Sequence, residues 1–457
     1  MIILGTNSIK DTGYDVANSC RFNSGSSDNL SIALSSTATN TKKGTLSFWF
    51  KTQGFNQQYP IAKGAGTIFY LYFNSSGQLV WQNASTNTRI TNQVFRDPTA
   101  WSNIVVNFDT TQSTASNRQK MYFNGTEITS FGTSNDLSLN QSISIFDGDS
   151  NTRAISGYVG GGYWNGYMSE VVGIDGLQLD PTSFGEFDED SGIWKPKDVS
   201  GLTFGNNGFY LDFEDSSALG ADVSGNSNNF TVNNLTAIDQ STDTCTNNFA
   251  TLNPLYTFTN NFTYSEGNLQ VVGGGNSWRG AIGTIGITKG KWFYEIKIIS
   301  STNTYFYHGF GSYDVYAPST PHKNGVLFYN NDGGEIYTGD GTTHTSTSAN
   351  YGTFAQNDIM SLAVDYDNSL FSVYKNGSAL VTNYDFGSQT YSSNLKNGKT
   401  IAPLLSHYGS STYVANFGSP PYSESGGNSD ANGYGNFSMA VPSGYFSLNS
   451  KNLAEFG

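Results

Sequence analysis

Apolar and polar residues alternate with a period of two in many short segments of this 457-residue chain. Two of these segments resemble each other. Met121 to Ile128 reads Met-Tyr-Phe-Asn-Gly-Thr-Glu-Ile, and Phe371 to Leu380 reads Phe-Ser-Val-Tyr-Lys-Asn-Gly-Ser-Ala-Leu. The alternation makes one sheet face apolar, and Asn-Gly supplies the two φ > 0 positions of a type I′ turn. Each segment is therefore predicted to form a β-hairpin.

The other strand-like segments form two series, separated by turns rich in Ser, Thr, Asn and Gly. The first series comprises residues 44–51, 67–73, 101–108, the first hairpin and 163–172. The second comprises residues 290–297, 305–311, 358–365, the second hairpin and 412–418. Short strands with turns at regular intervals are typical of antiparallel sandwiches. We therefore predict an all-β fold of two tandem antiparallel β-sandwiches with loop-rich connections.

Composition narrows the classes of partner. Only 13% of residues are charged, while aromatic residues reach 14%, so the chain can pack a core although its surface is built mainly from hydroxyls and amides. The formal charge is −14 and no Lys/Arg cluster stands out, which argues against nucleic acid and anionic lipid as partners. No run approaches the roughly 20 apolar residues of a membrane helix. We expect no membrane insertion and, because Met1 to Leu4 is too short for a signal peptide, no secretion by the general pathway.

Several motifs resemble those of known families. The first series, over roughly residues 15 to 215, resembles a laminin G-like, concanavalin A-type jelly roll in its strand Thr45 to Phe50 and its hairpin Tyr122 to Gly125. The second series resembles a SPRY domain, whose motifs occur in family order at 290–295, 358–365, 371–377 and 416–418. Both families are β-sandwiches of related architecture, which accounts for the repeated hairpin.

The segments that connect these series resemble the connecting segments of virion proteins from marine bacteriophages. They are residues 209–220, 223–230, 243–254 and 442–453. This resemblance implies a particle-surface protein that is assembled in the host cytoplasm. The expected division is a laminin G-like domain at 1–215, a connecting segment at 216–258, a SPRY-like domain at 259–420, and a flexible spacer and tail at 421–457.

The sequence gives catalysis little support. Glycosidases on the concanavalin fold place two carboxylates at alternate positions of one strand, and no Glu-x-Asp-x-Glu motif occurs here. The acidic cluster of Glu186, Asp188, Glu189 and Asp190 is flanked by Gly and Ser, which predicts a solvated loop. The four histidines show no short-range ligand spacing, and Cys20 and Cys245 form no metal motif, although their pairing stays open. We predict a protein that is no enzyme and requires no cofactor.

Calcium is the one cation that the sequence suggests. Asp147, Asp149 and Asn151 alternate in a loop that contains Gly148, and their oxygens are the hard donors that Ca²⁺ prefers. Laminin G-like domains often carry such an ion near the rim of the sandwich. An Asx-rich turn is the alternative interpretation of the same residues.

Two groups of residues are candidates for ligand binding. Tyr158, Tyr163, Trp164 and Asn165 combine aromatic rings with an amide, as a glycan site would, although aromatic residues at such positions are often part of a core. In SPRY domains partner recognition usually sits on loops at one edge. The corresponding candidates here are Trp278, Arg279, Tyr313, Asp314, Tyr337 and His344.

These observations together favour a multi-copy structural protein on a phage particle, either a tail fibre, a spike or a capsid-surface component. Its expected partners are other virion proteins and further copies of itself, with a host surface glycan as a candidate ligand. The alternative function is a lectin-like adhesin or a depolymerase that acts on host surface polysaccharide.

Overall fold

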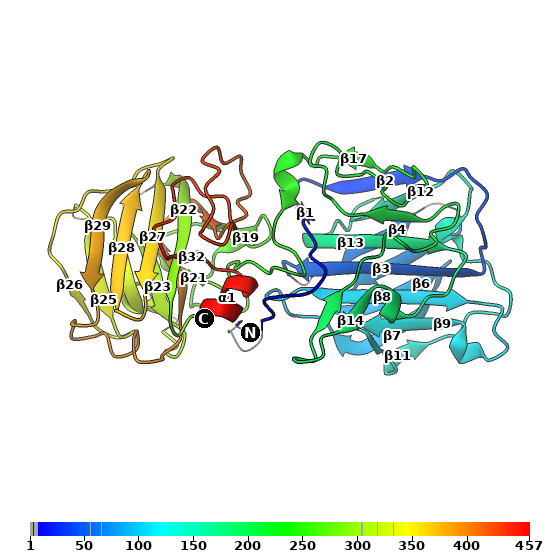
Figure 1. The fold of residues 1–457 in the computed structure, drawn as a ribbon, viewed down its shortest axis with the longest axis horizontal. Helices are drawn as coiled ribbons and strands as arrows, with labels where there is room; N and C mark the ends of the chain where they lie inside the picture. Colours follow the sequence, from blue (N-terminus) through cyan, green and yellow to red (C-terminus); the bar gives the residue numbers. More distant parts are fainter. Residues whose placement is uncertain are drawn as a thin grey trace. The chain divides into compact units, whose positions relative to one another are not determined.

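The structure is a computed structural model that describes residue 3 and residues 8–54, 56–64, 66–158, 160–302, 305–317, 319–331 and 333–457. It divides into two compact units, a first unit of Thr12–Thr246 and a second unit of Met1–Asp11 with Asn247–Gly457 (Figure 1). In the described part of the chain α1 (Ser450–Phe456) is the one α-helix. Each predicted strand overlaps an observed one, so the all-β prediction is confirmed.

The first unit contains two large antiparallel sheets. One runs in the order β10 (Thr126–Glu127), β9 (Gln119–Phe123), β8 (Ser102–Asp109), β3 (Lys43–Thr52), β13 (Gly166–Asp175), β1 (Ser19–Phe22) and β18 (Gln240–Ser241), with β16 (Phe209–Leu211) also paired to β13. The other runs in the order β11 (Phe131–Ser134), β7 (Thr86–Val94), β6 (Gln78–Asn83), β5 (Phe69–Phe73), β4 (Gln58–Lys63), β12 (Thr152–Ile155), β2 (Asn29–Ala33) and β17 (Thr231–Asn233).

Short elements complete the first unit. β14 (Gly185–Phe187) and β15 (Trp194–Pro196) form a separate two-stranded hairpin. Four 3₁₀ turns are η2 (Ala115–Asn117), η3 (Ser144–Phe146), η4 (Pro181–Ser183) and η5 (Ala237–Asp239). The core between the two large sheets contains buried side chains from both, including Phe48 of β3, Trp81 of β6 and Met168 of β13. This packing of sheet on sheet makes the unit a β-sandwich.

The second unit is also a sandwich. One sheet runs in the order β19 (Thr263–Ser265), β20 (Gln270–Gly273), β31 (Ser411–Asn416), β22 (Lys291–Ser301), β27 (Ile359–Asp365), β28 (Leu370–Lys375) and β29 (Ser378–Asp385), with β32 (Phe446–Ser447) paired in parallel to β22. The other runs in the order β21 (Trp278–Ile282), β30 (Ile401–Tyr408), β23 (Phe306–Ser312), β24 (Gly325–Tyr329), β25 (Glu335–Gly339) and β26 (His344–Ser346). A 3₁₀ turn, η6 (Pro321–Lys323), precedes β24, and the core contains Trp292, Tyr294, Phe310 and Phe371.

Both Asn-Gly hairpins form as predicted. Asn124 and Gly125 have φ of 45° and 74° between β9 and β10, and Asn376 and Gly377 have φ of 48° and 82° between β28 and β29. Two successive positive φ values are the signature of a type I′ turn. Gly125 has a second role, because a Cβ at this position would lie 2.4 Å from the ring of Trp194.

The boundaries of the units differ from the predicted ones. The expected connecting segment 216–258 is divided between the units, because β17 and β18 pair with β2 and β1 of the first unit, whereas Ala250 and Leu252 lie in the second core. The stretch 421–457, expected to be a flexible spacer and tail, is packed as well. Its residues Leu448 and Leu453 are buried in the second core, and Phe437 packs against Phe293 of β22.

Buried carboxylates hold this C-terminal stretch in place. Glu295 of β22 accepts hydrogen bonds from Ser438 N at 3.0 Å and Ser438 Oγ at 2.6 Å. Asp430 accepts from Ser447 Oγ at 2.6 Å and Asn452 Nδ2 at 2.8 Å. A segment rich in Ser, Asn and Gly is ordered here because its polar groups find buried partners, which composition alone does not reveal.

The structure also bears on the two cysteines and on membrane insertion. Cys20 and Cys245 are both free cysteines, and Cys20 is fully buried. In the described residues no helix is long and apolar enough to span a membrane.

We predict that a fragment of residues 247–457 melts cooperatively and at a higher temperature than a fragment of residues 259–420. The shorter fragment lacks Leu252, Phe437, Leu448 and Leu453, and each buried apolar side chain contributes about 1.5–3 kcal/mol. Circular dichroism melting of both fragments checks this expectation. Equal melting temperatures would show that the C-terminal stretch adds nothing to the second unit.

Candidate ligand-binding surfaces

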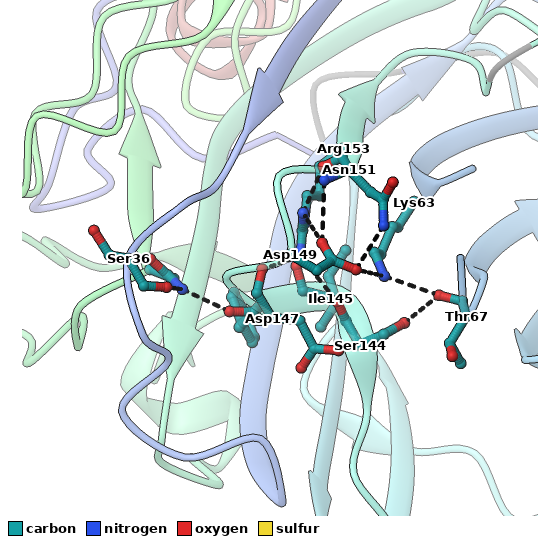
Figure 2. A network of polar contacts seen from close by, with 11 residues as sticks. Ser36, Lys63, Thr67, Ser144, Ile145, Asp147, Asp149, Asn151 and Arg153 are labelled. Carbon is teal, nitrogen blue, oxygen red and sulfur yellow. Dashed lines mark hydrogen bonds and ion pairs between the residues drawn. The ribbon is translucent and has the colours of Figure 1, made fainter. Parts of the chain in front are cut away.

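The predicted calcium loop is closed by two cationic side chains (Figure 2). Asp149 Oδ2 lies 2.6 Å from Lys63 Nζ of β4, and Asp149 Oδ1 lies 2.8 Å from Arg153 Nη1 of β12. Asn151 also donates to Asp149, from Nδ2 at 2.8 Å and from its backbone N at 3.2 Å. Arg153 further donates to the backbone oxygen of Asp147, so the whole loop is tied to β12.

The donors of this loop do not fit a calcium ion. Both carboxylate oxygens of Asp149 already accept hydrogen bonds from N–H groups, and Lys63 is fully buried beside them. Partial burial alone would raise the pKa of Asp149, but hydrogen bonds from Lys63, Asn151 and Arg153 outweigh it and hold this pKa well below its usual range. Among the described residues no group of three or more His, Cys, Asp or Glu side chains could hold a metal. The geometry matches the Asx-rich turn, closed by ion pairs.

We predict that Asp149→Asn lowers the free energy of unfolding by about 3 kcal/mol, because it leaves the buried Lys63 ammonium without its carboxylate. The wild-type melting temperature should be the same with calcium and with a chelator. Asp190→Asn is the matched control, since Asp190 is an exposed acid at a hairpin tip. A melting temperature that falls on chelation in the wild type, and not in Asp149→Asn, would restore the calcium hypothesis.

A hollow of about 290 Å³ crosses the outer face of the second sheet of the first unit. Its floor is a cross-strand row of small side chains, in which Ala62 of β4, Ala154 of β12 and Ser31 of β2 are register partners. Tyr158 and Tyr163 from the loop after β12 line it together with two amides, Asn29 and Asn233. We call this hollow the tyrosine groove.

A cluster of tyrosines holds the ring of Tyr158. Its ring centroid lies 4.6 Å from that of Tyr59 and 5.5 Å from that of Tyr70, and Tyr59 stacks on Tyr72 at 4.7 Å. Burial raises the pKa of Tyr59 to about 12, so its hydroxyl keeps its proton in neutral solution. Gly162 has φ of 66°, and a Cβ there would lie 2.5 Å from the Tyr59 ring, so only glycine permits this loop to lie against the cluster.

The other two residues of that predicted group do not belong to the groove. Trp164 is 1% exposed and packs between the sheets, 5.7 Å from the Phe50 ring and 5.8 Å from the Phe73 ring. Its assignment to ligand binding was wrong, and the core alternative is correct. Asn165 has a structural contact, since its Oδ1 accepts from Ser24 N at 3.3 Å.

The second unit gathers part of its predicted group on the outer face of the sheet that contains β21 and β25. The Trp278 ring stacks on His322 at 4.3 Å, Tyr337 lies 4.7 Å from His344, and Tyr307 lies 5.2 Å from Tyr337. Burial, with smaller effects from Lys323 and His344, lowers the pKa of His322 to about 4. This surface is therefore aromatic, and burial also lowers the pKa of His344, so that both histidines are held toward the neutral form.

Two predicted residues of the second unit, Arg279 and Asp314, are not part of this aromatic cluster. Arg279 follows Trp278 in β21 and is the register partner of the buried His407, so its side chain points to the opposite face of the sheet. Tyr313 packs against the same buried cluster as Trp278 and Tyr337, and it accepts a hydrogen bond from Asn253 Nδ2 at 3.1 Å. Asp314 accepts one from Thr400 N at 3.2 Å. Both contacts fix loops within the unit.

Sequence reasoning did not single out Glu170, which lies at a bulge in the middle of β13. Its φ is 50°, in the left-handed region, and its side chain is 5% exposed. Glu170 Oε2 accepts hydrogen bonds from Tyr210 Oη at 2.8 Å and Tyr14 Oη at 3.3 Å. Burial is the main cause that raises the pKa of Glu170 to about 8. The segment Met-Ser-Glu-Val reads as an ordinary strand, so nothing in the sequence signals this strain or this burial.

We predict that Glu170→Gln stabilises the first unit relative to the wild type as the pH rises. The folded-state pKa is raised, so the contribution of Glu170 is fully present below its unfolded pKa of about 4.5 and is lost as the pH rises through about 8. The difference in unfolding free energy should move in the variant's favour by about 1.4 kcal/mol per pH unit between these values. Denaturant unfolding at several pH values measures it, with the exposed Glu189→Gln as a control that should show no such trend.

The comparisons with known proteins bear on the first unit. Residues 24–174 match the family model of the concanavalin A-like lectin/glucanases superfamily. A search of curated proteins returned no match.

Several solved structures are similar to parts of this chain. The SPRY domain of human HERC1 is 15% identical at a TM-score of 0.24, covering 32% of this chain and 87% of that one. A SAP-like pentraxin from Limulus polyphemus is 16% identical at a TM-score of 0.27, and the match covers 36% of this chain and 79% of the pentraxin chain. A candidate carbohydrate-binding protein from Bacteroides ovatus is 14% identical at a TM-score of 0.33, and the match covers 48% of this chain and 59% of that protein's chain.

Proposed function

We propose that the protein is a non-catalytic structural component displayed on a bacteriophage particle, and that its first unit binds a host surface glycan in the tyrosine groove. The observation that carries the glycan proposal is the groove itself, where two tyrosine rings and two amides meet over a floor of small side chains. The match of residues 24–174 to a lectin-containing superfamily supports the same class of ligand.

The chemistry of the groove suits a neutral sugar chain. Tyr158 and Tyr163 offer flat apolar faces for the C–H face of a sugar ring. The amides of Asn29 and Asn233 are held by hydrogen bonds, since Asn233 Nδ2 donates to Asn29 Oδ1 at 3.0 Å and Asn29 Nδ2 donates to Ser27 O at 3.0 Å, and their oxygens are acceptors for sugar hydroxyls. Every residue that lines the groove is uncharged, so sulfate or carboxylate groups find no cation there. Binding should therefore depend little on salt.

Display on a particle is supported by two features of the chain. The four joining segments resemble those of phage virion proteins; three of them lie within one folded unit, and 243–254 crosses the boundary between the units. A surface with 13% charged residues associates mainly through apolar, aromatic and neutral polar groups. Contacts with other virion proteins and with further copies of this chain are of that kind. Labelling intact particles with an antibody to this chain tests the location, and particles without label would overturn it.

We predict that Tyr158→Ala and Tyr163→Ala each weaken binding of neutral host surface polysaccharide about tenfold or more, because truncating a tyrosine at the centre of a binding site commonly costs above 1.4 kcal/mol. Isothermal titration with the full chain measures the affinity. Tyr316→Ala is the control, since Tyr316 is 60% exposed in the second unit and lies outside the groove. If the wild type and the three variants bind with equal affinity, the tyrosine groove is not the glycan-binding site.

The size of the bound polysaccharide should stay unchanged. Glu186 is an exposed side chain on the β14 hairpin, where it lies 3.6 Å from Lys195 Nζ. The carboxylate of Asp188 lies 3.4 Å from the same Nζ, so both acids are engaged in ion pairs with one lysine rather than placed as an acid and a nucleophile. Chromatographic sizing after incubation checks this expectation. Shortening that follows protein concentration and disappears in Glu186→Gln or Glu189→Gln would make the protein a depolymerase.

A further inference from the structure

Two oppositely charged side chains meet inside the first unit with almost no access to water. Lys51 lies near the end of β3, and Asp243 follows β18 after one residue. Lys51 Nζ and Asp243 Oδ2 are 2.8 Å apart, and their side chains are 1% and 2% exposed. The two residues are separated by 192 positions in the chain.

Aromatic rings enclose this pair. Trp49, Trp101, Tyr167 and Trp194 form one buried cluster, and Lys51 Nζ lies 5.7 Å from the centroid of the Tyr167 ring. Trp101 donates from Nε1 to Asp243 Oδ1 at 2.9 Å, on the carboxylate oxygen that Lys51 leaves free. The carboxyl carbon is thus held between an amine on one side and a hydrogen-bond donor on the other.

A dry site of this kind favours uncharged groups. Moving two ions out of water is costly, and their mutual attraction repays the cost only in part. Burial lowers the pKa of Lys51, although the charge of Asp243 opposes this effect. An unprotonated lysine is a good nucleophile, and a reacting pair held in contact behaves as if at very high concentration.

We propose that Lys51 and Asp243 condense to an intramolecular isopeptide bond between Lys51 Nζ and Asp243 Cγ. A proton first passes from the Nζ ammonium to Oδ2, which turns the ion pair into an amine and a carboxylic acid. The Nζ lone pair then attacks Cγ, and the negative charge that develops on Oδ1 is stabilised by the Trp101 Nε1–H. A second amine proton passes to the Oδ2 hydroxyl, the Cγ–Oδ2 bond breaks, and one water molecule leaves. The amide keeps one N–H, so no oxidant, reductant or further reactant is needed.

The first unit supplies an internal comparison. Lys63 and Asp149 are also in contact, at 2.6 Å, but the Asp149 side chain is 32% exposed and accepts hydrogen bonds from Asn151 and Arg153 as well. Access to water stabilises the ionised carboxylate of Asp149, which an amine does not attack. Contact alone is therefore insufficient, and the pair of Lys51 and Asp243 differs from this one in that both of its side chains are excluded from water.

The bond would tie β3 to the C-terminal end of the first unit. A cross-link between residues this far apart removes a large part of the conformational freedom of the unfolded chain. The unit would then resist heat and pulling forces even though few surface ion pairs support it. Such resistance suits a protein that is displayed outside a cell.

Mass spectrometry of the purified full chain tests the proposal. The expected mass lies below that of the sequence by one water molecule, and proteolysis should yield a branched peptide that joins the peptides of Lys51 and Asp243. The peptides of Lys63 and Asp149 should be recovered separately. An intact mass that equals the sequence after prolonged incubation at a temperature just below melting, with all four peptides separate, would overturn the proposal.

Two variants sharpen the test. Asp243→Asn should lose one ammonia rather than one water, which identifies Asp243 Cγ as the carbon attacked. Lys51→Arg keeps the positive charge but cannot condense, so it should show the full sequence mass and melt about 10 °C or more below the wild type. Lys63→Arg is the matched control and should retain the mass loss. A mass loss that persists in Lys51→Arg would also refute the proposal, and if a variant fails to fold, the branched wild-type peptide still decides.

Discussion

The central strands of each sandwich are buried on both faces, and this constraint governs the rest of the structure. Every residue of β13 and all but the first of β3 are buried, although one face of their sheet already meets the other sheet. The second face must therefore be covered by segments from elsewhere in the same unit. In the first unit this cover includes Tyr14, Phe184, Trp194 and Phe204, and in the second unit it includes Phe437 and Met439 over β22.

Covering the outer face has a direct electrostatic consequence. Alternation along a strand normally leaves polar side chains in water, but Lys51, Glu170 and Glu295 point into the covered face and are buried with it. Each of these buried side chains then needs a polar partner, and the segment that packs over the face supplies it. Asp243, Tyr210 and Ser438 fill this role, and each lies far along the sequence from the residue that it contacts. The three contacts tie the covering segments to the strands beneath them.

The sequence predicted the elements that depend on local residue patterns. Alternation and Asn-Gly turns depend on neighbouring residues, so the strands and both hairpins were recoverable. The covering segments were not, because the stretch after Pro421 has the composition of a flexible spacer, and its order depends on Glu295 and Asp430 finding partners in three dimensions. The same distinction applies to the candidate site. Tyr158 and Tyr163 stand out beside a run of glycines, whereas Tyr59 and Tyr70, which hold Tyr158, lie about 90–100 positions earlier in the chain.

The predicted sites failed where a partner came from a distant strand. Asp149 reads as a free oxygen donor until Lys63 of β4 and Arg153 of β12 are placed beside it. Trp164 reads as an exposed ring beside glycines until the sheets close over it. Few charges remain on the surface of this protein, so its strongest electrostatic contacts lie inside, where water and salt do not weaken them. A neutral groove outside and a dry ion pair inside both accord with the replacement of surface ions by hydroxyls and amides.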